Sequence, residues 1–170
     1  MFVYTVLSIT LLISLITDVR KRKILNIVTL PVILIGLVYY TSTLGWEGFL
    51  FSGKGFLVGI ALLLVPYLLG GMGAGDVKLM AAIGALTGTM FTLHAFVYIA
   101  LIGGIISLVL IVKNRGFRNS IKSFFFTLLF LRSSLGSLKL SANKESSILF
   151  PYGVPIVIGT ICQVIFGVMK

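Results

Sequence analysis

Residues 2–23 of the chain read FVYTVLSITLLISLITDVRKRK: an apolar run (Phe2–Thr17), one aspartate (Asp18) and, beyond Val19, a basic cluster (Arg20–Lys23). About 20 mostly apolar residues, each adding about 1.5 Å, cross a bilayer core about 30 Å thick. No basic segment precedes the run and no small-residue cleavage site follows it, which argues against a secretory signal peptide. We therefore expect a retained membrane-spanning helix that continues to Asp18.

The composition of the whole chain supports a membrane protein. Of its 170 residues, 58% are hydrophobic and 11% are charged, and the mean hydropathy is +1.16. A soluble domain of this size could not bury so much apolar surface, so lipid is the expected solvent and disorder is excluded. A single cysteine, Cys162, provides neither a disulfide framework nor a thiolate zinc site. The net charge is +10, and the basic residues that cause it lie between apolar runs. This placement indicates anionic lipid head groups as partners and no nucleic acid.

Further apolar runs predict an all-α polytopic protein with about six transmembrane helices in one domain, residues 1–170. In chain order the predicted spans are Phe2–Thr17, Ile27–Tyr40, Gly55–Leu69, Val77–Thr89, Leu93–Val112 and Ile148–Val168. Asn26 is expected to cap the second span. Thr41–Gly53 is expected to be a polar loop. The basic stretch Lys113–Ser147 contains an apolar core, residues 124–131, that is too short to span and predicts an interfacial helix.

The distribution of basic residues predicts the orientation. Cytoplasmic loops carry an excess of Lys and Arg, so the Arg20–Lys23 cluster and the seven basic residues from Lys113 to Lys144 should face the cytoplasm. The loop around Glu47 should lie outside. Six spans satisfy these demands if the N-terminus is outside. Asp18 and Asp76 then lie at the same, cytoplasmic, face of the membrane.

Small residues recur at helical spacing in two of the predicted spans. Gly55-x-x-x-Gly59 and Gly84-x-x-x-Gly88 are patterns that allow helix backbones to approach closely in lipid. We expect this packing to bring the first, third and fourth predicted spans close enough for Asp18 and Asp76 to meet.

Asp18 and Asp76 are the only aspartates in the chain, which has four acidic residues in all. A charged side chain near the bilayer centre costs about 2.5–3.5 kcal/mol on insertion scales, so intramembrane carboxylates indicate function. Asp18 lies at the C-terminal end of a predicted helix, where the helix dipole disfavours an anion. A salt bridge to one of the basic residues Arg20–Lys23 would explain the presence of Asp18 without any catalytic role. Asp76 precedes an apolar helix, where aspartate is a favoured N-cap.

If the two carboxylates share a site, they cannot both ionise easily and the pair holds one proton. The ionised member can take a proton from water while the neutral member polarises a peptide carbonyl. This is aspartic peptide hydrolysis, and it requires neither metal nor cofactor. The glycine-rich stretch Gly70–Gly75 would let an extended substrate lie against the site. A phosphate-binding loop is rejected because the stretch lacks the P-loop and Rossmann spacings.

The segment Gly73–Gly84 reads GAGDVKLMAAIG and closely resembles the G-x-G-D region of bacterial type IV prepilin peptidases. Asp18, followed by a basic stretch and Asn26, resembles the first-aspartate region of the same enzymes. The segment Pro151–Pro155, PYGVP, is similar to a third, weaker feature of the family. The similar regions together cover most of the chain.

The resemblance implies a membrane aspartic endopeptidase of the bacterial cytoplasmic membrane that cuts the basic leader of prepilins or pseudopilins at the cytoplasmic face. It implies Asp18 and Asp76 as the catalytic pair, with Gly73 and Gly75 shaping the loop. Lys78 and Asn26 belong to the motifs, although Lys78, two residues beyond Asp76 in a helix, should point to a different face. Larger members carry a cytoplasmic insertion with zinc-binding cysteines and N-methylate the new terminus. This chain has no such insertion, and the resemblance does not extend to methylation.

Two other classes of protein remain open on the residues alone. In a small transporter or channel, Asp18 and Asp76 would be proton or cation sites. Such sites usually lie near mid-membrane, often in repeated halves, and neither feature is present in the sequence. In a membrane scaffold without chemistry, both aspartates would only cap helices or form ion pairs.

Overall fold

The computed structural model describes residues 1–21, 23–68, 71–113 and 152–168. It contains four helices in these ranges: α1 (Phe2–Lys21), α2 (Asn26–Leu68), α3 (Ala74–Lys113) and α5 (Gly153–Val168). No strand occurs in the described ranges, so the all-α prediction is confirmed for them. The chain forms two compact units, residues 1–103 with 150–170 and residues 104–149. The candidate site lies in the first unit. The described part of the second unit is the C-terminal end of α3.

Three of these helices are long and apolar enough to cross a membrane, namely α1, α2 and residues 74–109 of α3. The chain therefore has the character of a membrane protein. The predicted count of about six spans is not confirmed. α5 is apolar, but its 16 residues are shorter than the about 20 that a span usually needs. The predicted interfacial helix lies outside the described residues, and the prediction of a single domain stays a prediction.

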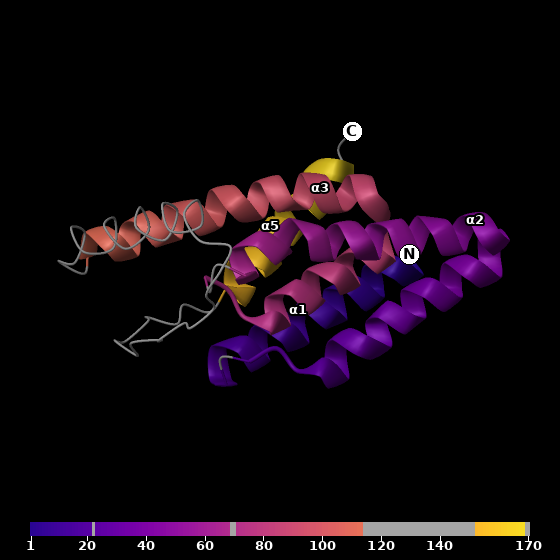
Figure 1. The fold of residues 1–170 in the computed structure, drawn as a ribbon, viewed down its shortest axis with the longest axis horizontal. Coiled ribbons are helices and arrows are strands. Elements are labelled where there is room, and N and C mark those ends of the chain that lie inside the picture. Colours follow the sequence, from indigo (N-terminus) through magenta and orange to yellow (C-terminus); the bar gives the residue numbers. More distant parts are fainter. Residues whose placement is uncertain (22, 69–70, 114–151, 169–170) are drawn as a thin grey trace, which may run out of the picture. The chain divides into compact units, whose positions relative to one another are not determined.

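The prediction of a polar loop at Thr41–Gly53 is wrong, because α2 continues through it. One residue, Gly45, leaves helical geometry, with φ 61° and ψ −135°. Such a positive φ is easily reached by glycine. The hydroxyls of Thr41 and Thr43 donate to the carbonyl oxygens of Leu37 and Tyr39, at 2.7 and 2.9 Å. Side chains that bond to the preceding helical turn make this polar stretch compatible with a helix. In Figure 1, α2 runs out and folds back on itself.

The predicted fourth and fifth spans form one helix, α3, with a single break at Gly88 (φ 78°, ψ 177°). A side chain at Gly88 would run into the ring of Phe51 on α2, so glycine is required both for the backbone angle and for the space. α3 also begins at Ala74, three residues earlier than predicted. Asp76 therefore lies inside the first turn of the helix.

The first half of α3 forms the centre of the core. Nearly every side chain from Val77 to Leu86 is buried, on all faces of the helix. The second half of α2 packs directly on it, because a Cβ at Gly55 or Gly84 would meet the backbone carbonyl of the other residue. The hydroxyl of Ser52 donates to the carbonyl oxygen of Ala85 at 2.8 Å across the same contact. The small-residue pattern in the sequence therefore marks this helix contact, as lipid-embedded packing requires.

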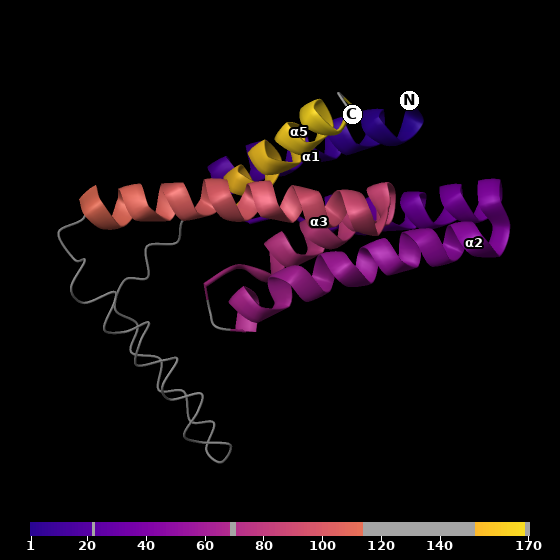
Figure 2. The ribbon, with the colours of Figure 1, turned by 90° about the horizontal axis from the view of Figure 1, so that it is seen from above.

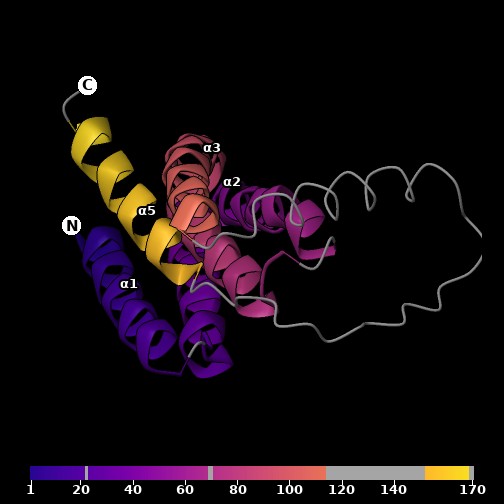
Figure 3. The same ribbon diagram turned by 90° about the vertical axis from the view of Figure 1, so that its left-hand side faces the viewer.

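α1 packs against α5 and against α2. Figures 2 and 3 show α5, drawn in yellow, alongside the indigo α1. On α1 the buried residues are Leu7, Thr10, Leu11, Ser14 and Asp18. They recur every three or four positions and so share one helix face. The face that packs inward therefore ends at Asp18.

We predict that Gly84→Ala destabilises the protein by about 3 kcal/mol, because the added methyl group overlaps the Gly55 carbonyl and the two backbones must separate. Gly53→Ala is the matched control, since a Cβ at this helical glycine has no neighbour within 4 Å. It should be neutral or mildly stabilising. Thermal or chemical unfolding in detergent measures both variants. Equal stability of the two variants would contradict the assigned packing.

Candidate functional site

Asp18 and Asp76 line the same pocket, which has a volume of about 330 Å³. The walls come from the end of α1, the link into α2 and the start of α3. The lining residues are Asp18, Lys23, Ile24, Leu25, Asn26, Gly73, Ala74, Gly75 and Asp76. The structure thus brings together five of the six residues that the sequence singled out. The sixth, Lys78, lies next to them and is described below.

Asp18 is almost completely buried, with 5% of its surface exposed. Its Oδ2 accepts a hydrogen bond from the backbone N–H of Gly153 at 2.9 Å. Gly153 is the first residue of α5, so Asp18 supplies an acceptor for the start of that helix. In the described ranges Asp18 forms no ion pair with Arg20, Lys21 or Lys23. The salt-bridge explanation of Asp18 therefore has no support from these residues.

Asp76 is 7% exposed and lies in the first turn of α3. Its Oδ2 accepts from the N–H of Gly73 at 3.1 Å, and its own N–H donates to the Gly73 carbonyl oxygen at 3.1 Å. This is the arrangement of an acidic residue at the third helical position reaching back to the N-cap. Asp76 therefore does cap α3, from N3 and not from the predicted N-cap position. Although Asp76 caps the helix, its side chain still lines the pocket.

The two carboxylates line the same pocket, one from the end of α1 and one from the start of α3. In the described part of the chain, each accepts its hydrogen bond through Oδ2 alone. Oδ1 of each carboxylate is thus the oxygen that can bind a water molecule or a substrate. Two nearly buried carboxylates with one engaged oxygen each can share a proton and act as an acid and a base.

Gly75 allows the link between α1 and α2 to lie against the start of α3. A Cβ at Gly75 would be 2.9 Å from the Cβ of Ile24 and 3.3 Å from its backbone nitrogen and oxygen. A close approach of two backbones requires glycine here. Gly73 contributes the N–H that holds Asp76. Both glycines thus shape the pocket through its backbone.

Lys78 joins the two walls of the site. Its Nζ donates to Oδ1 of Asn26 at 2.9 Å, which connects the first residue of α2 to the second turn of α3. The expectation that Lys78 points to a different helix face from Asp76 is consistent with this contact. The prediction that Asn26 caps α2 is wrong: Asn26 is the first helical residue of α2, and its side-chain oxygen accepts the bond from Lys78.

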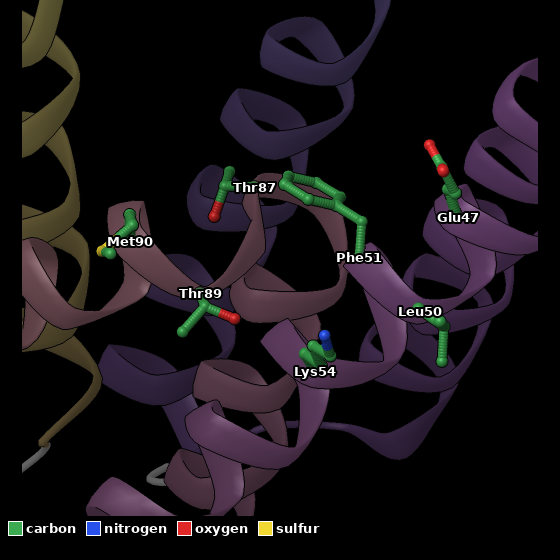
Figure 4. A pocket seen from close by; sticks show the side chains of 7 residues that line it. All are labelled: Glu47, Leu50, Phe51, Lys54, Thr87, Thr89 and Met90. Atoms are coloured by element: carbon green, nitrogen blue, oxygen red, sulfur yellow. The ribbon is translucent and has the colours of Figure 1, made fainter.

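A second pocket, of about 400 Å³, is lined by α2 and α3 near their breaks (Figure 4). Its lining residues are Glu47, Leu50, Phe51, Lys54, Thr87, Thr89 and Met90. It has one carboxylate, so it cannot form an acid–base pair of the kind described above. In the described part of the chain, no three or more His, Cys, Asp or Glu side chains are grouped in a way that could hold a metal ion.

The sequence did not single out Gly153 or the link residues Lys23, Ile24 and Leu25 as parts of the site. Lys23 could have been expected, since it belongs to the basic cluster five residues beyond Asp18. Gly153 lies in the segment Pro151–Pro155, and the resemblance of this segment to the family implies no role for it. Its contact with Asp18 joins residues 135 positions apart, and no local pattern encodes it.

A sequence model of the type IV leader peptidase family matches residues 5–108, which is more than half of the chain. The match includes Asp18 and Asp76 and ends well before α5. No curated protein and no solved structure matches the chain. These findings give no support to the alternative of a proton- or cation-coupled transporter.

We predict that Lys78→Met and Asn26→Leu each destabilise the protein by about 1 kcal/mol, because each removes one side of the bond that joins α2 to α3. The double variant should lose little more than either single variant, which a double-mutant cycle of unfolding free energies detects. Lys54→Met is the control, because Lys54 is an exposed lysine on α2 at the other pocket. Fully additive effects would show that the two side chains do not interact.

Proposed function

Because the chain belongs to the type IV leader peptidase family, we propose that it is an aspartic endopeptidase that removes the leader of type IV prepilins or pilin-like proteins. Asp18 and Asp76 are its catalytic pair. Family membership makes the chain a peptidase, and the long apolar helices give it the character of a membrane protein. The proposal adds the catalytic class, the residues and the substrate.

One observation carries the proposal. The only two aspartates of the chain, 58 positions apart, line the same pocket, and both are more than nine-tenths buried. Each is held through one oxygen by a backbone N–H. A scaffold could use one carboxylate as a cap, but it would gain nothing from placing two groups of like charge in one pocket, where they repel each other.

The chemistry follows from two carboxylates that share one proton. The ionised carboxylate accepts a proton from a water molecule, whose oxygen attacks the carbonyl carbon of the scissile peptide bond. The protonated carboxylate donates a hydrogen bond to the carbonyl oxygen and stabilises the charge that develops there. When the tetrahedral intermediate collapses, the C–N bond breaks and the leaving nitrogen takes a proton from the pair. The second carboxylate thus supplies the acid that the first, as a base, requires.

The proposed location is the bacterial inner membrane, with the pocket at the cytoplasmic face. Arg20, Lys21 and Lys23 are exposed beside the pocket, at the end of α1 that carries Asp18. An excess of basic residues marks the cytoplasmic side of a membrane protein. These residues, and the basic stretch from Lys113 to Lys144, are proposed to bind anionic lipid head groups.

We predict that Asp18→Asn and Asp76→Asn each lower the rate of prepilin cleavage by at least about 100-fold, because each removes a proton acceptor or donor from the pair. Co-expression with a prepilin in a bacterial membrane, followed by gel mobility of the prepilin, measures the loss of the leader. Both variants preserve the size and the hydrogen-bonding oxygen of the side chain, so the fold should persist.

The control is Glu47→Gln, which removes the carboxylate of the other pocket. It should cleave at the wild-type rate. The catalytic pair is wrong if either aspartate variant retains normal cleavage, and the substrate assignment is wrong if the wild-type protein leaves the prepilin intact.

A further inference from the structure

The contact between Asp18 and the start of α5 gives a function to a residue outside the family match. We propose that Gly153 is a positioning residue of the catalytic site: its N–H fixes the Asp18 carboxylate, and its missing side chain leaves the space that this carboxylate occupies. The inference rests on the proposed function, in which Asp18 is catalytic. It concerns the part of the chain that the family match, ending at residue 108, does not cover.

The hydrogen bond is well suited to hold a carboxylate. It is buried, and the Gly153 nitrogen lies 2.9 Å from Asp18 Oδ2. Gly153 begins a helix of 16 residues, and the first backbone N–H groups of a helix have no acceptor within it. Asp18 satisfies one of them. The positive end of the α5 dipole also offsets the negative end of α1, where an anion would otherwise be disfavoured.

Glycine is the only residue that fits at this position. A Cβ at Gly153 would lie 2.5 Å from Asp18 Oδ2, 2.9 Å from its Cγ and 3.1 Å from its Cβ. All three of these atoms belong to the Asp18 side chain, which lines the pocket. Any side chain at this position must therefore displace the Asp18 carboxylate or the start of α5.

The start of α5 is itself firmly packed, so its N–H is a fixed reference point. Ile156, Val157 and Thr160 are at most 2% exposed. A Cβ at Gly159 would lie 2.5 Å from Cγ1 of Ile99 on α3, which shows how closely the two helices pack. A donor held by a buried helix needs no rearrangement when the reaction occurs, and it keeps Asp18 Oδ1 in a constant place.

The test compares two alanine substitutions on the same helix. Gly153→Ala should lower kcat for prepilin cleavage by at least about tenfold and leave KM within about twofold, because it misplaces a reacting group and not the substrate. Gly159→Ala adds a methyl group with an equally close neighbour, but this neighbour is Ile99 and not the carboxylate. Because this contact helps to hold α5, the variant should lower the unfolding temperature, but its fall of kcat should be at least about threefold smaller than that of Gly153→Ala.

Two kinetic outcomes would overturn the inference: normal kcat in Gly153→Ala, or an equal fall of kcat in Gly159→Ala. The second would mean that packing of α5, and not the contact with Asp18, is what matters. Unfolding temperatures of the purified proteins show whether both variants are folded at the assay temperature.

Hydrogen exchange tests the contact without any activity, and it decides the question if Gly153→Ala does not fold. Amide exchange at the start of α5 should be at least about tenfold faster in Asp18→Ala than in the wild-type protein, because the Gly153 N–H loses its acceptor. Exchange in the second half of α5 should not change. Unchanged exchange at Gly153 would overturn the inference. Absence of cleavage by the wild-type protein would instead overturn the proposed function, and the exchange result would still decide the contact.

Discussion

The packing of the first half of α3 against the second half of α2 is the constraint on which the other features depend. All side chains from Val77 to Leu86 except that of Lys78 are buried, so the backbone of this segment cannot shift without opening the core. The contact is close because Gly55 and Gly84 face each other's backbone carbonyls. In lipid, where apolar side chains gain little from leaving the solvent, such close van der Waals contact is what holds helices together. The contact also fixes the start of α3, and with it Asp76.

The two aspartates are placed by a common device, the start of a helix. Asp76 accepts from the N-cap of its own helix, α3, and Asp18 accepts from the first residue of a distant helix, α5. The capping explanation and the catalytic one are therefore not exclusive. A cap occupies one carboxylate oxygen and offers partial positive charge, which lowers the cost of burying an anion. The other oxygen remains for chemistry.

The sequence predicted the helical class and the membrane character because these depend on composition and on apolar runs, which are local properties. It also predicted that Asp18 and Asp76 lie together, since two scarce carboxylates are unusual in an apolar chain, whereas Asn26, Gly73 and Gly75 were indicated only by the resemblance to the family. The predictions of helix boundaries were wrong where a single residue determines the backbone geometry. Gly45 and Gly88 each interrupt a helix at a single position, and the polar residues around Gly45 are accommodated by hydroxyl bonds to the preceding turn. Composition alone could not distinguish this arrangement from a loop.

The Asp18–Gly153 contact was beyond prediction for a different physical reason. Every helix begins with N–H groups that have no acceptor within the helix. A predicted helix start therefore indicates that these donors exist, but not which residue accepts from them. The acceptor is determined by how α1 and α5 pack, and this in turn depends on buried faces such as the one that ends at Asp18. The family match ends at residue 108, yet the carboxylate that it contains is held by residue 153. The part of the chain with the recognisable motif therefore does not contain every group that holds the site in place.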